Sequence, residues 1–193
     1  MGEKWEEKEA ELLRDWERTR QWSLEEFARI YRELDVDFDV WFYESEMEEE
    51  GKKIVQEMLA KGIAEVRNGA VVVDLAQKTG NPELGVLVLL RSDGSALYST
   101  KDLALAKKKR EEYGVEQSVY VVASPQTLYF RQLFTTLEIA GIAPQKNFCH
   151  LSYEVVMLPE GLISSRMGRM VLYEDLSRLV REMAREIVTR KNP

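Results

Sequence analysis

Apolar residues recur at helical spacing in the first third of the chain. The segment 5–18 is mostly charged, yet it places a set of large apolar side chains on one face, namely Trp5, Leu12, Leu13 and Trp16. A second helix is expected to begin at Ser23, because Ser23 and Glu26 have the spacing of a capping box. The pattern therefore predicts two helices before residue 35.

Short β-rich runs and one further helix follow. "DFDVWFY" (37–43) is predicted to form a strand, and "MEEEGKKIVQEMLAKG" (47–62) a helix that ends at Gly62. Asn68-Gly69 lies between two short β-rich runs, which is the strongest short sequence signal for a β-hairpin. The middle of the chain is thus expected to carry a small antiparallel insert.

Strands and helices alternate in the rest of the chain. The apolar runs "VLVLL" (86–90), "SVYVVA" (118–123) and "FCHLSYEVVML" (148–158) are predicted strands. Thr100 is expected to cap the helix of residues 101–114, Ser124 to cap the helix of 125–141, and 172–190 to be largely helical. Uninterrupted apolar strands separated by helices are typical of a parallel sheet. The predicted fold class is α/β: a partial Rossmann-like parallel sheet with flanking helices and a small antiparallel hairpin insert.

Composition and charge exclude several classes of function. The chain has 193 residues, of which 45% are apolar and 32% charged, as in an ordinary globular protein. Its net charge of −7 argues against unaided nucleic-acid binding. With one histidine and one cysteine, the chain has too few ligands of these types for a structural zinc site and cannot form an internal disulfide. No apolar run approaches a membrane span and no signal peptide is recognisable, so a cytoplasmic protein without membrane association is expected.

The best candidate for a ligand site lies at the carboxyl ends of the predicted strands. Tyr98, Asp102 and Gln126 all fall at such ends, where open parallel sheets bind their ligands. One carboxylate, one phenol and one amide could enclose a small cation, and a carboxylate can bind a guanidinium in bidentate fashion. The alternative is structural: an acid in a first helical turn stabilises the helix, and Tyr98 could be a core residue.

A second candidate is the loop that precedes the last predicted helix. "GLISSRMGRMVLYEDL" (161–176) supplies Ser164, Ser165, Arg166 and Gly168 before a helix, which suits a phosphate chain. Leu162 and Met167 are apolar where ammonium groups would be wanted. The loop could bind a nucleotide, could have lost that function, or could be only a helix entry.

Several motifs in order resemble one family. "LYSTKDLALA", "YVVASPQTLYFRQLF", "HLSYEVVMLPEG" and "SSRMGRMVLYEDL" resemble the second half of the catalytic domain of arginyl-tRNA synthetases. The upstream "RTRQWSLEEFARIYRELDVDFDVWFYESE" is similar to the connective segment of that family. The resemblance implies a connective region over 1–90 and the second half of a class I catalytic domain over 91–193.

The resemblance implies an arginine pocket that is unchanged in residue type. In that family a Tyr-x-x-x-Asp pair contacts arginine, which here is Tyr98 and Asp102. A glutamine at the head of the next helix matches Gln126, and a glutamate of a D-x-x-x-x-E-S stretch matches Glu44. These four residues are the expected arginine-binding set.

The sequence departs from the family at the motifs that bind the nucleotide. The complete family uses ATP and Mg²⁺, but no H-I-G-H-type motif is present, and both lysine positions of the K-M-S-K-S-type loop are apolar. Glu154 stands where the family usually has glycine. Among the loop residues only Arg166 remains as a weak catalytic candidate, so this chain is expected to form no adenylate alone.

Three roles remain open at this stage. The first is a catalytic-domain segment that binds arginine, with tRNA a partner only of the complete enzyme. The second is a free-standing, non-catalytic arginine sensor or regulatory module. The third is a structural half that needs a complementing chain, because three of the four tryptophans lie in the first 22 residues and could drive self-association or bind a companion chain.

Overall fold

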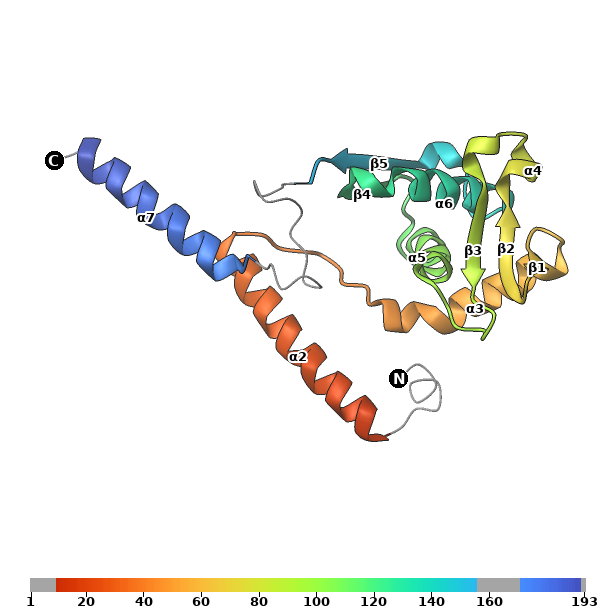
Figure 1. Ribbon diagram of the computed structural model, residues 1–193, viewed down its shortest axis with the longest axis horizontal. Helices are drawn as coiled ribbons and strands as arrows, with labels where there is room; N and C mark the ends of the chain where they lie inside the picture. The colour runs from red at the N-terminus through yellow and green to blue at the C-terminus, as the bar shows by residue number, and fades with distance from the viewer. Residues whose placement is uncertain (1–9, 156–170, 192–193) are drawn as a thin grey trace. The chain divides into compact units, whose positions relative to one another are not determined.

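The computed structural model describes residues 10–155 and 171–191 (Figure 1). Contacts within the chain divide it into two compact units, Met1–Glu46 and Met47–Pro193, which are described separately. The functional division expected between residues 90 and 91 stays a prediction.

The first unit is built on one long helix, α2 (Ala10–Glu33). The two helices expected here are a single one, so the predicted capping box is wrong. Ser23 lies inside α2 and donates its hydroxyl hydrogen to the Thr19 carbonyl oxygen at 3.0 Å. The physical reason is that residues 19–22 contain no helix breaker, and a serine inside a helix satisfies its hydroxyl on the preceding turn.

The strand predicted over residues 37–43 does not form. This stretch is irregular and follows a turn in which Asp35 has φ 56°. Its aromatic rings pack onto α2 instead: the Phe38 ring lies 4.9 Å from Tyr31 and 4.9 Å from Trp41. Arg20 of α2 also lies 4.2 Å from the Tyr43 ring. The aromatic residues of this stretch therefore contact a helix, and among the described residues the stretch pairs with no strand.

The second unit begins within helix α3 (Glu44–Ala60) and continues into sheet A. This three-stranded antiparallel sheet has the order β1 (Glu65–Arg67), β2 (Ala70–Asp74) and β3 (Val86–Leu90). Asn68 and Gly69 connect β1 to β2 with φ values of 52° and 81°, so the predicted hairpin is confirmed. Helices α4 (Leu75–Thr79) and η1 (Pro82–Leu84) lead to β3, which joins the hairpin and not the parallel sheet.

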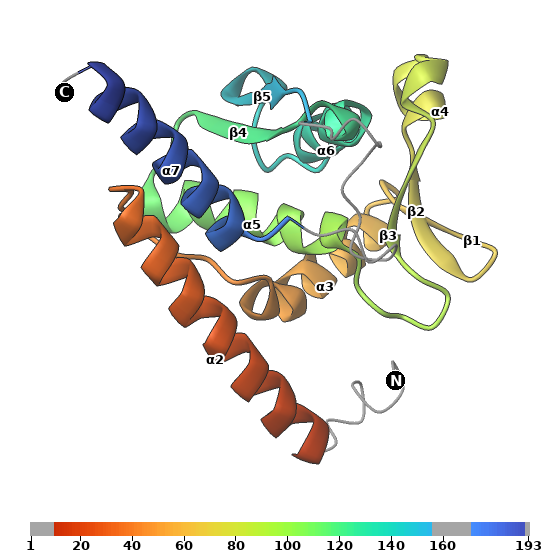
Figure 2. The same cartoon turned by 60° about the vertical axis from the view of Figure 1, so that its left-hand side comes forward.

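Sheet B is parallel and two-stranded. Strand β4 (Ser118–Ala123) pairs with β5 (Phe148–Tyr153) in the register Ser118↔Phe148 to Ala123↔Tyr153. Helix α5 (Tyr98–Tyr113) precedes β4, and η2 (Ser124–Gln126), α6 (Thr127–Ile139) and η3 (Gln145–Asn147) connect β4 to β5 (Figure 2). A parallel sheet, a small antiparallel sheet and flanking helices confirm the predicted α/β class.

One apolar core joins α3, both sheets, α5 and α6. Its fully buried members come from every one of these helices and from sheet A, and include Val55, Val73, Leu89, Leu103, Leu133 and Leu137. The inner face of sheet B meets α6 through stacked aromatic rings, because Phe134 lies 5.2 Å from Phe148. The outer face exposes Val119, Val121 and Leu151, each more than half accessible.

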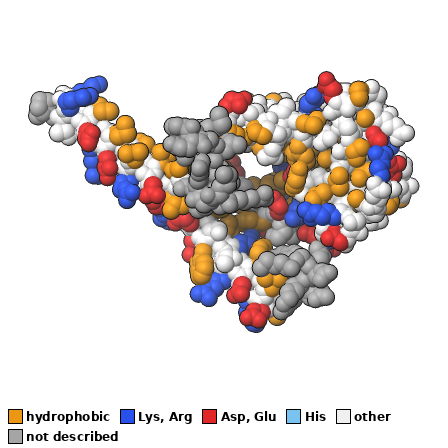
Figure 3. Space-filling model, in the orientation of Figure 1, with side chains coloured by type: hydrophobic (Ala, Val, Ile, Leu, Met, Phe, Trp, Pro, Cys, Tyr) orange, Lys and Arg blue, Asp and Glu red, His pale blue; other side chains and the backbone are white. Residues whose placement is uncertain are grey.

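Helix α7 (Tyr173–Lys191) forms as predicted, and no residue of it is buried. Its apolar side chains recur at intervals of three and four residues and are about half accessible: Leu176, Leu179, Val180, Met183 and Ile187. The space-filling view shows orange hydrophobic side chains recurring along this helix (Figure 3). The helix therefore presents an apolar stripe to the surface.

Candidate functional site

The first turn of α5 is anchored directly to strand β3. Ser99 donates its hydroxyl hydrogen to the Val88 carbonyl oxygen at 2.7 Å, and Thr100 donates to the Leu89 carbonyl oxygen. Both side chains are buried. Thr100 is therefore not the helix cap that the sequence predicted, because α5 already begins at Tyr98 and the Thr100 hydroxyl is used on the neighbouring strand. The anchoring fixes the helix turn that carries Tyr98 and Asp102.

Asp102 lies in the second turn of α5, one turn after Tyr98. The helix dipole stabilises a carboxylate only within the first turn, so it contributes little to Asp102. Instead, Tyr129 of the next helix, α6, donates its hydroxyl hydrogen to Asp102 Oδ2. The Tyr129 ring also meets the Tyr98 ring edge-on, with centroids 4.7 Å apart and an interplanar angle of 72°. Tyr129 thus contacts both members of the Tyr-x-x-x-Asp pair.

The surroundings of Asp102 keep two tyrosines protonated. The pKa of Tyr129 is raised chiefly by burial, then by the negative charge of Asp102 and the hydrogen bond to it. The pKa of Tyr120 is also raised by burial and by Asp102. Burial lowers the pKa of Lys109, whose ammonium group lies 4.3 Å from the centre of the Tyr120 ring. Tyr129 is therefore a persistent hydrogen-bond donor to the carboxylate.

Tyr98 forms the accessible side of this cluster. Tyr98 is 56% exposed, whereas Tyr129, which meets its ring edge-on, is buried. The Asp102 carboxylate accepts a hydrogen bond from the buried Tyr129 and lies one helical turn after the exposed Tyr98. Such a carboxylate can bind a planar cation through charge-assisted hydrogen bonds, and the exposed ring can contact the cation's flat face. The structural alternative for Tyr98, that of a core residue, is wrong because of this exposure.

The other two predicted arginine ligands lie at helix starts. Gln126 ends η2 and directly precedes α6, where it is exposed, and within the described part of the chain its side chain makes no hydrogen bond. Glu44 is the first residue of α3, is exposed, and belongs to the first compact unit. Their participation in a pocket stays a prediction.

The carboxyl ends of β4 and β5 are joined by a hydroxyl–carboxylate bond. Ser124 donates to Glu154 Oε2 at 3.0 Å, so it does not cap α6 as predicted. His150 Nε2 lies 2.8 Å from the Val122 carbonyl oxygen on the inner face, whereas the neighbouring Cys149 is exposed. The strand therefore separates these two side chains, as its alternation requires.

The described residues at these strand ends do not fit a triphosphate. Glu154 contributes a carboxylate there, which repels phosphate oxygens. The four loop residues predicted to contact a nucleotide, Ser164, Ser165, Arg166 and Gly168, lie outside the described residues. Over 10–155 and 171–191 there is also no cluster of three acidic, histidine or cysteine side chains that could hold a metal ion. No described helix has the length and apolar character needed to cross a bilayer.

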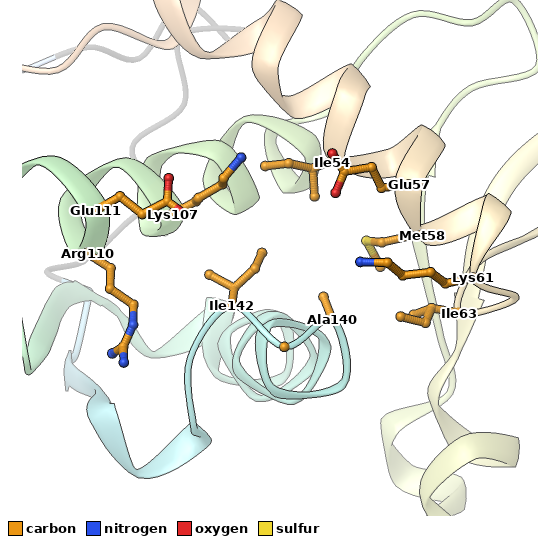
Figure 4. A pocket seen from close by; sticks show the side chains of 11 residues that line it. Ile54, Glu57, Met58, Lys61, Ile63, Lys107, Arg110, Glu111, Ala140 and Ile142 are labelled. Carbon is orange, nitrogen blue, oxygen red and sulfur yellow. The ribbon is translucent and has the colours of Figure 1, made fainter.

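A separate cavity of about 240 Å³ opens between α3, α5 and the turn that follows α6 (Figure 4). Its apolar wall includes Ile54, Met58 and Ile142, and its charged residues have both signs, among them Glu57, Lys61, Lys107, Arg110 and Glu111. None of the predicted site residues within the described ranges lines it. The mixture of charges gives it no preference for an anion or a cation.

Tyr129 is the member of the cluster around Asp102 that sequence reasoning missed. It lies three residues after Gln126, about one helical turn further along the chain. A tyrosine one turn after a residue expected in a pocket is a signal that could have identified it. The sequence alone does not show that this residue reaches across to the neighbouring helix.

Comparison with known proteins identifies relatives over most of the chain. Residues 3–193 match the family described as tRNA synthetases class I (R), catalytic domain. An arginine–tRNA ligase from Bdellovibrio bacteriovorus is 45% identical over 161 residues, which is 83% of this chain and 27% of that protein. One from Clostridium perfringens is 37% identical over 190 residues, 98% of this chain and 33% of that protein.

Solved structures agree in fold. Arginyl-tRNA synthetase from Plasmodium falciparum aligns with 97% of this chain and 31% of its own, with a TM-score of 0.68 and 17% sequence identity. The enzyme from Thermus thermophilus aligns with 74% of this chain and 30% of its own, with a TM-score of 0.54 and 26% identity. The chain spans about a third of the length of the relatives it matches.

These matches support a segment of a synthetase catalytic domain and do not favour the alternative of a free-standing, non-catalytic arginine sensor or regulatory module. The family match extends from the first helix to the last, and the curated relatives share more than a third of their residues with this chain where they align. The chain belongs to the family of class I tRNA synthetase catalytic domains of the arginine type.

Proposed function

We propose that this chain forms the part of an arginyl-tRNA synthetase catalytic domain that recognises the arginine side chain. The observation that supports it most strongly is the Tyr98–Asp102 pair, which α5 presents on one face and which Tyr129 contacts from α6. The Asp102 carboxylate would bind the guanidinium, and the exposed Tyr98 ring would cover its flat face. Gln126, which directly precedes α6, completes the proposed set within the second unit.

Asp102 carries most of the discrimination in this proposal. A guanidinium offers donors in a planar fork, whereas citrulline has nearly the same shape but no charge. Lysine has the charge but not the fork. The site should therefore prefer arginine to both, and it should lose that preference when the carboxylate is removed.

Calorimetric titration tests the proposal with arginine, lysine and citrulline. Truncating one member of a desolvated charge pair costs about 2–5 kcal/mol, so Asp102→Ala should weaken arginine binding by at least about thirtyfold. Glu49→Ala, which removes an exposed carboxylate from α3, is the matched control and should bind as the wild type does. Equal arginine affinity in the wild type and in Asp102→Ala would refute the assignment.

Adenylate formation is proposed to need more than this chain. The tRNA would be a partner of the complete enzyme, as the relatives' name arginine–tRNA ligase implies. ATP and Mg²⁺ would be its cofactors, as the family resemblance implies. Apolar Leu162 and Met167 replace two ammonium groups in the loop, and a single lost transition-state donor commonly lowers the rate about 100- to 1000-fold. ATP–pyrophosphate exchange by the purified chain should therefore equal a no-protein control, and a clear excess would contradict the proposal.

A further inference from the structure

The hydroxyl of Tyr129 makes a directed contact with a residue of the proposed site. Tyr129 is 9% exposed, and its hydroxyl donates to Asp102 Oδ2 across the gap between α6 and α5. The same ring packs edge-on against Tyr98 at 4.7 Å and against Phe130 at 5.2 Å. Three contacts fix the ring, so the hydroxyl has a defined direction.

We infer that Tyr129 is a positioning residue that sets the orientation of the Asp102 carboxylate for guanidinium binding; the inference rests on the function proposed above. A free aspartate side chain rotates about two bonds, and a bidentate pair with arginine requires one particular plane of the carboxylate. A hydrogen bond from a buried, fixed phenol removes that freedom before the ligand arrives.

Tyr129 also keeps its hydrogen at neutral pH. Burial and the nearby Asp102 charge raise its pKa, so the phenol donates to the carboxylate and does not compete with it as an anion. Among the described residues, the charged group that contacts it is Asp102 of α5, and Lys109 of the same helix lies over the Tyr120 ring. The positioning therefore does not switch off near neutral pH.

Tyr120 provides a matched control within the same cluster. Its hydroxyl is also buried but has no hydrogen-bond partner among the described residues, and its ring packs against Phe130 at 5.2 Å. Tyr120→Phe and Tyr129→Phe both remove one buried hydroxyl and leave an aromatic ring of the same shape. Only the second removes a bond to Asp102.

The experiment measures arginine and lysine affinity by calorimetry in four proteins: the wild type, Tyr129→Phe, Tyr120→Phe and Asp102→Ala. A hydrogen bond to a charged group corresponds to roughly a tenfold effect or more, so Tyr129→Phe should weaken arginine binding about tenfold. Lysine is a point charge and needs no carboxylate plane, so its affinity should fall much less. The ratio of arginine to lysine affinity should therefore drop in Tyr129→Phe and stay at the wild-type value in Tyr120→Phe.

The outcomes separate this inference from the proposed function. If Asp102→Ala loses arginine binding while Tyr129→Phe keeps the wild-type ratio, Tyr129 is structural and the inference alone is overturned. If the wild type and Asp102→Ala bind arginine equally or not at all, both are overturned. If Tyr129→Phe fails to fold, 3-fluorotyrosine at position 129 gives a second readout. Its fluorine resonance should shift when arginine is added to the otherwise wild-type protein, but not when it is added to the protein that also carries Asp102→Ala. A resonance that does not move in the otherwise wild-type protein would overturn the inference.

Discussion

The close approach of α3 to α5 predicts that Gly51→Ala destabilises the second unit. Gly51 is buried, and a methyl carbon at this position would lie 2.9 Å from Thr100 Cγ2, 3.0 Å from the Thr100 carbonyl carbon, and nearer still to the carbonyl oxygen. Carbon atoms pack best at about 3.5–4.0 Å, so the two helices would have to separate by roughly half an ångström or more. The obstacle is partly backbone, which cannot rotate away.

Two opposing effects decide the size of the change. Overpacking a close contact lowers the free energy of unfolding by about 1–3 kcal/mol. Replacing glycine with alanine inside a helix raises it by up to about 1 kcal/mol. Thr100 is fully buried and bonded to Leu89, so it cannot yield cheaply and the cost lies in the upper half of the range. We expect a net loss of about 1–2 kcal/mol, which lowers Tm by roughly 2–8 °C in a unit of this size.

Urea denaturation followed by circular dichroism measures the effect. Glu49→Ala, an exposed substitution in the same helix, is the control and should change stability by less than about 0.5 kcal/mol. Because Thr100 lies between Tyr98 and Asp102 on α5, Gly51→Ala should also weaken arginine binding, unlike the control. A Gly51→Ala variant as stable as the wild type, or more stable, would show that helix propensity dominates and that the close approach is not a constraint.

Two further predictions concern pH. The pKa values of Tyr120 and Tyr129 are raised above the ordinary 10.0, so the folded protein keeps protons that the unfolded chain releases. Their contribution to the free energy of unfolding is complete below pH 10.0 and declines above it by about 1.4 kcal/mol per pH unit for each group. Urea unfolding between pH 9 and 11.5 measures this decline. Tyr129→Phe should make the free energy of unfolding fall less steeply with pH, and an unchanged pH dependence would contradict the assignment. The second concerns Glu50, whose pKa is lowered by its hydrogen bond from Lys107 at 2.8 Å. That contribution is present above pH 4.5 and lost as pH falls through the lowered value, so Glu50→Gln should cost up to about 1 kcal/mol at pH 7 and progressively less as the pH falls below 4.5. A cost that does not decline with falling pH would point to packing instead.

Local sequence rules predicted the elements whose stability is local. The Asn68-Gly69 hairpin forms because both residues adopt the positive φ that its turn requires, and this depends only on neighbouring residues. Helix α7 also forms where it was predicted, and its apolar residues recur at helical spacing. These segments needed no knowledge of distant contacts.

The errors arose where a side chain found a distant partner. Thr100 and Ser124 have the residue type of helix caps, but their hydroxyls bond Leu89 and Glu154, residues 11 and 30 positions away. The expected strand near Phe38 is irregular because its rings pack on Tyr31 of the preceding helix. Periodicity cannot distinguish these alternatives, since it contains no information on which surfaces meet.

The residues of the candidate site also differ in how far the sequence identified them. Tyr98 and Asp102 could be identified in the sequence because their spacing of four residues places them on one helical face and matches a family motif. For Tyr129 the sequence supplies only its place one helical turn after Gln126, because its bond to Asp102 depends on the crossing of α5 and α6, which only the fold determines. Spacing can therefore mark such a residue as a candidate, but it does not show which side chain the residue contacts.

A structure of the protein with bound arginine is the most direct test of the central claim. The claim predicts guanidinium nitrogens about 2.7–2.9 Å from the Asp102 carboxylate, with Tyr129 still donating to that carboxylate and Tyr98 beside the bound group. Arginine bound instead in the cavity between α3 and α5, beside Glu57 and Glu111, would contradict it.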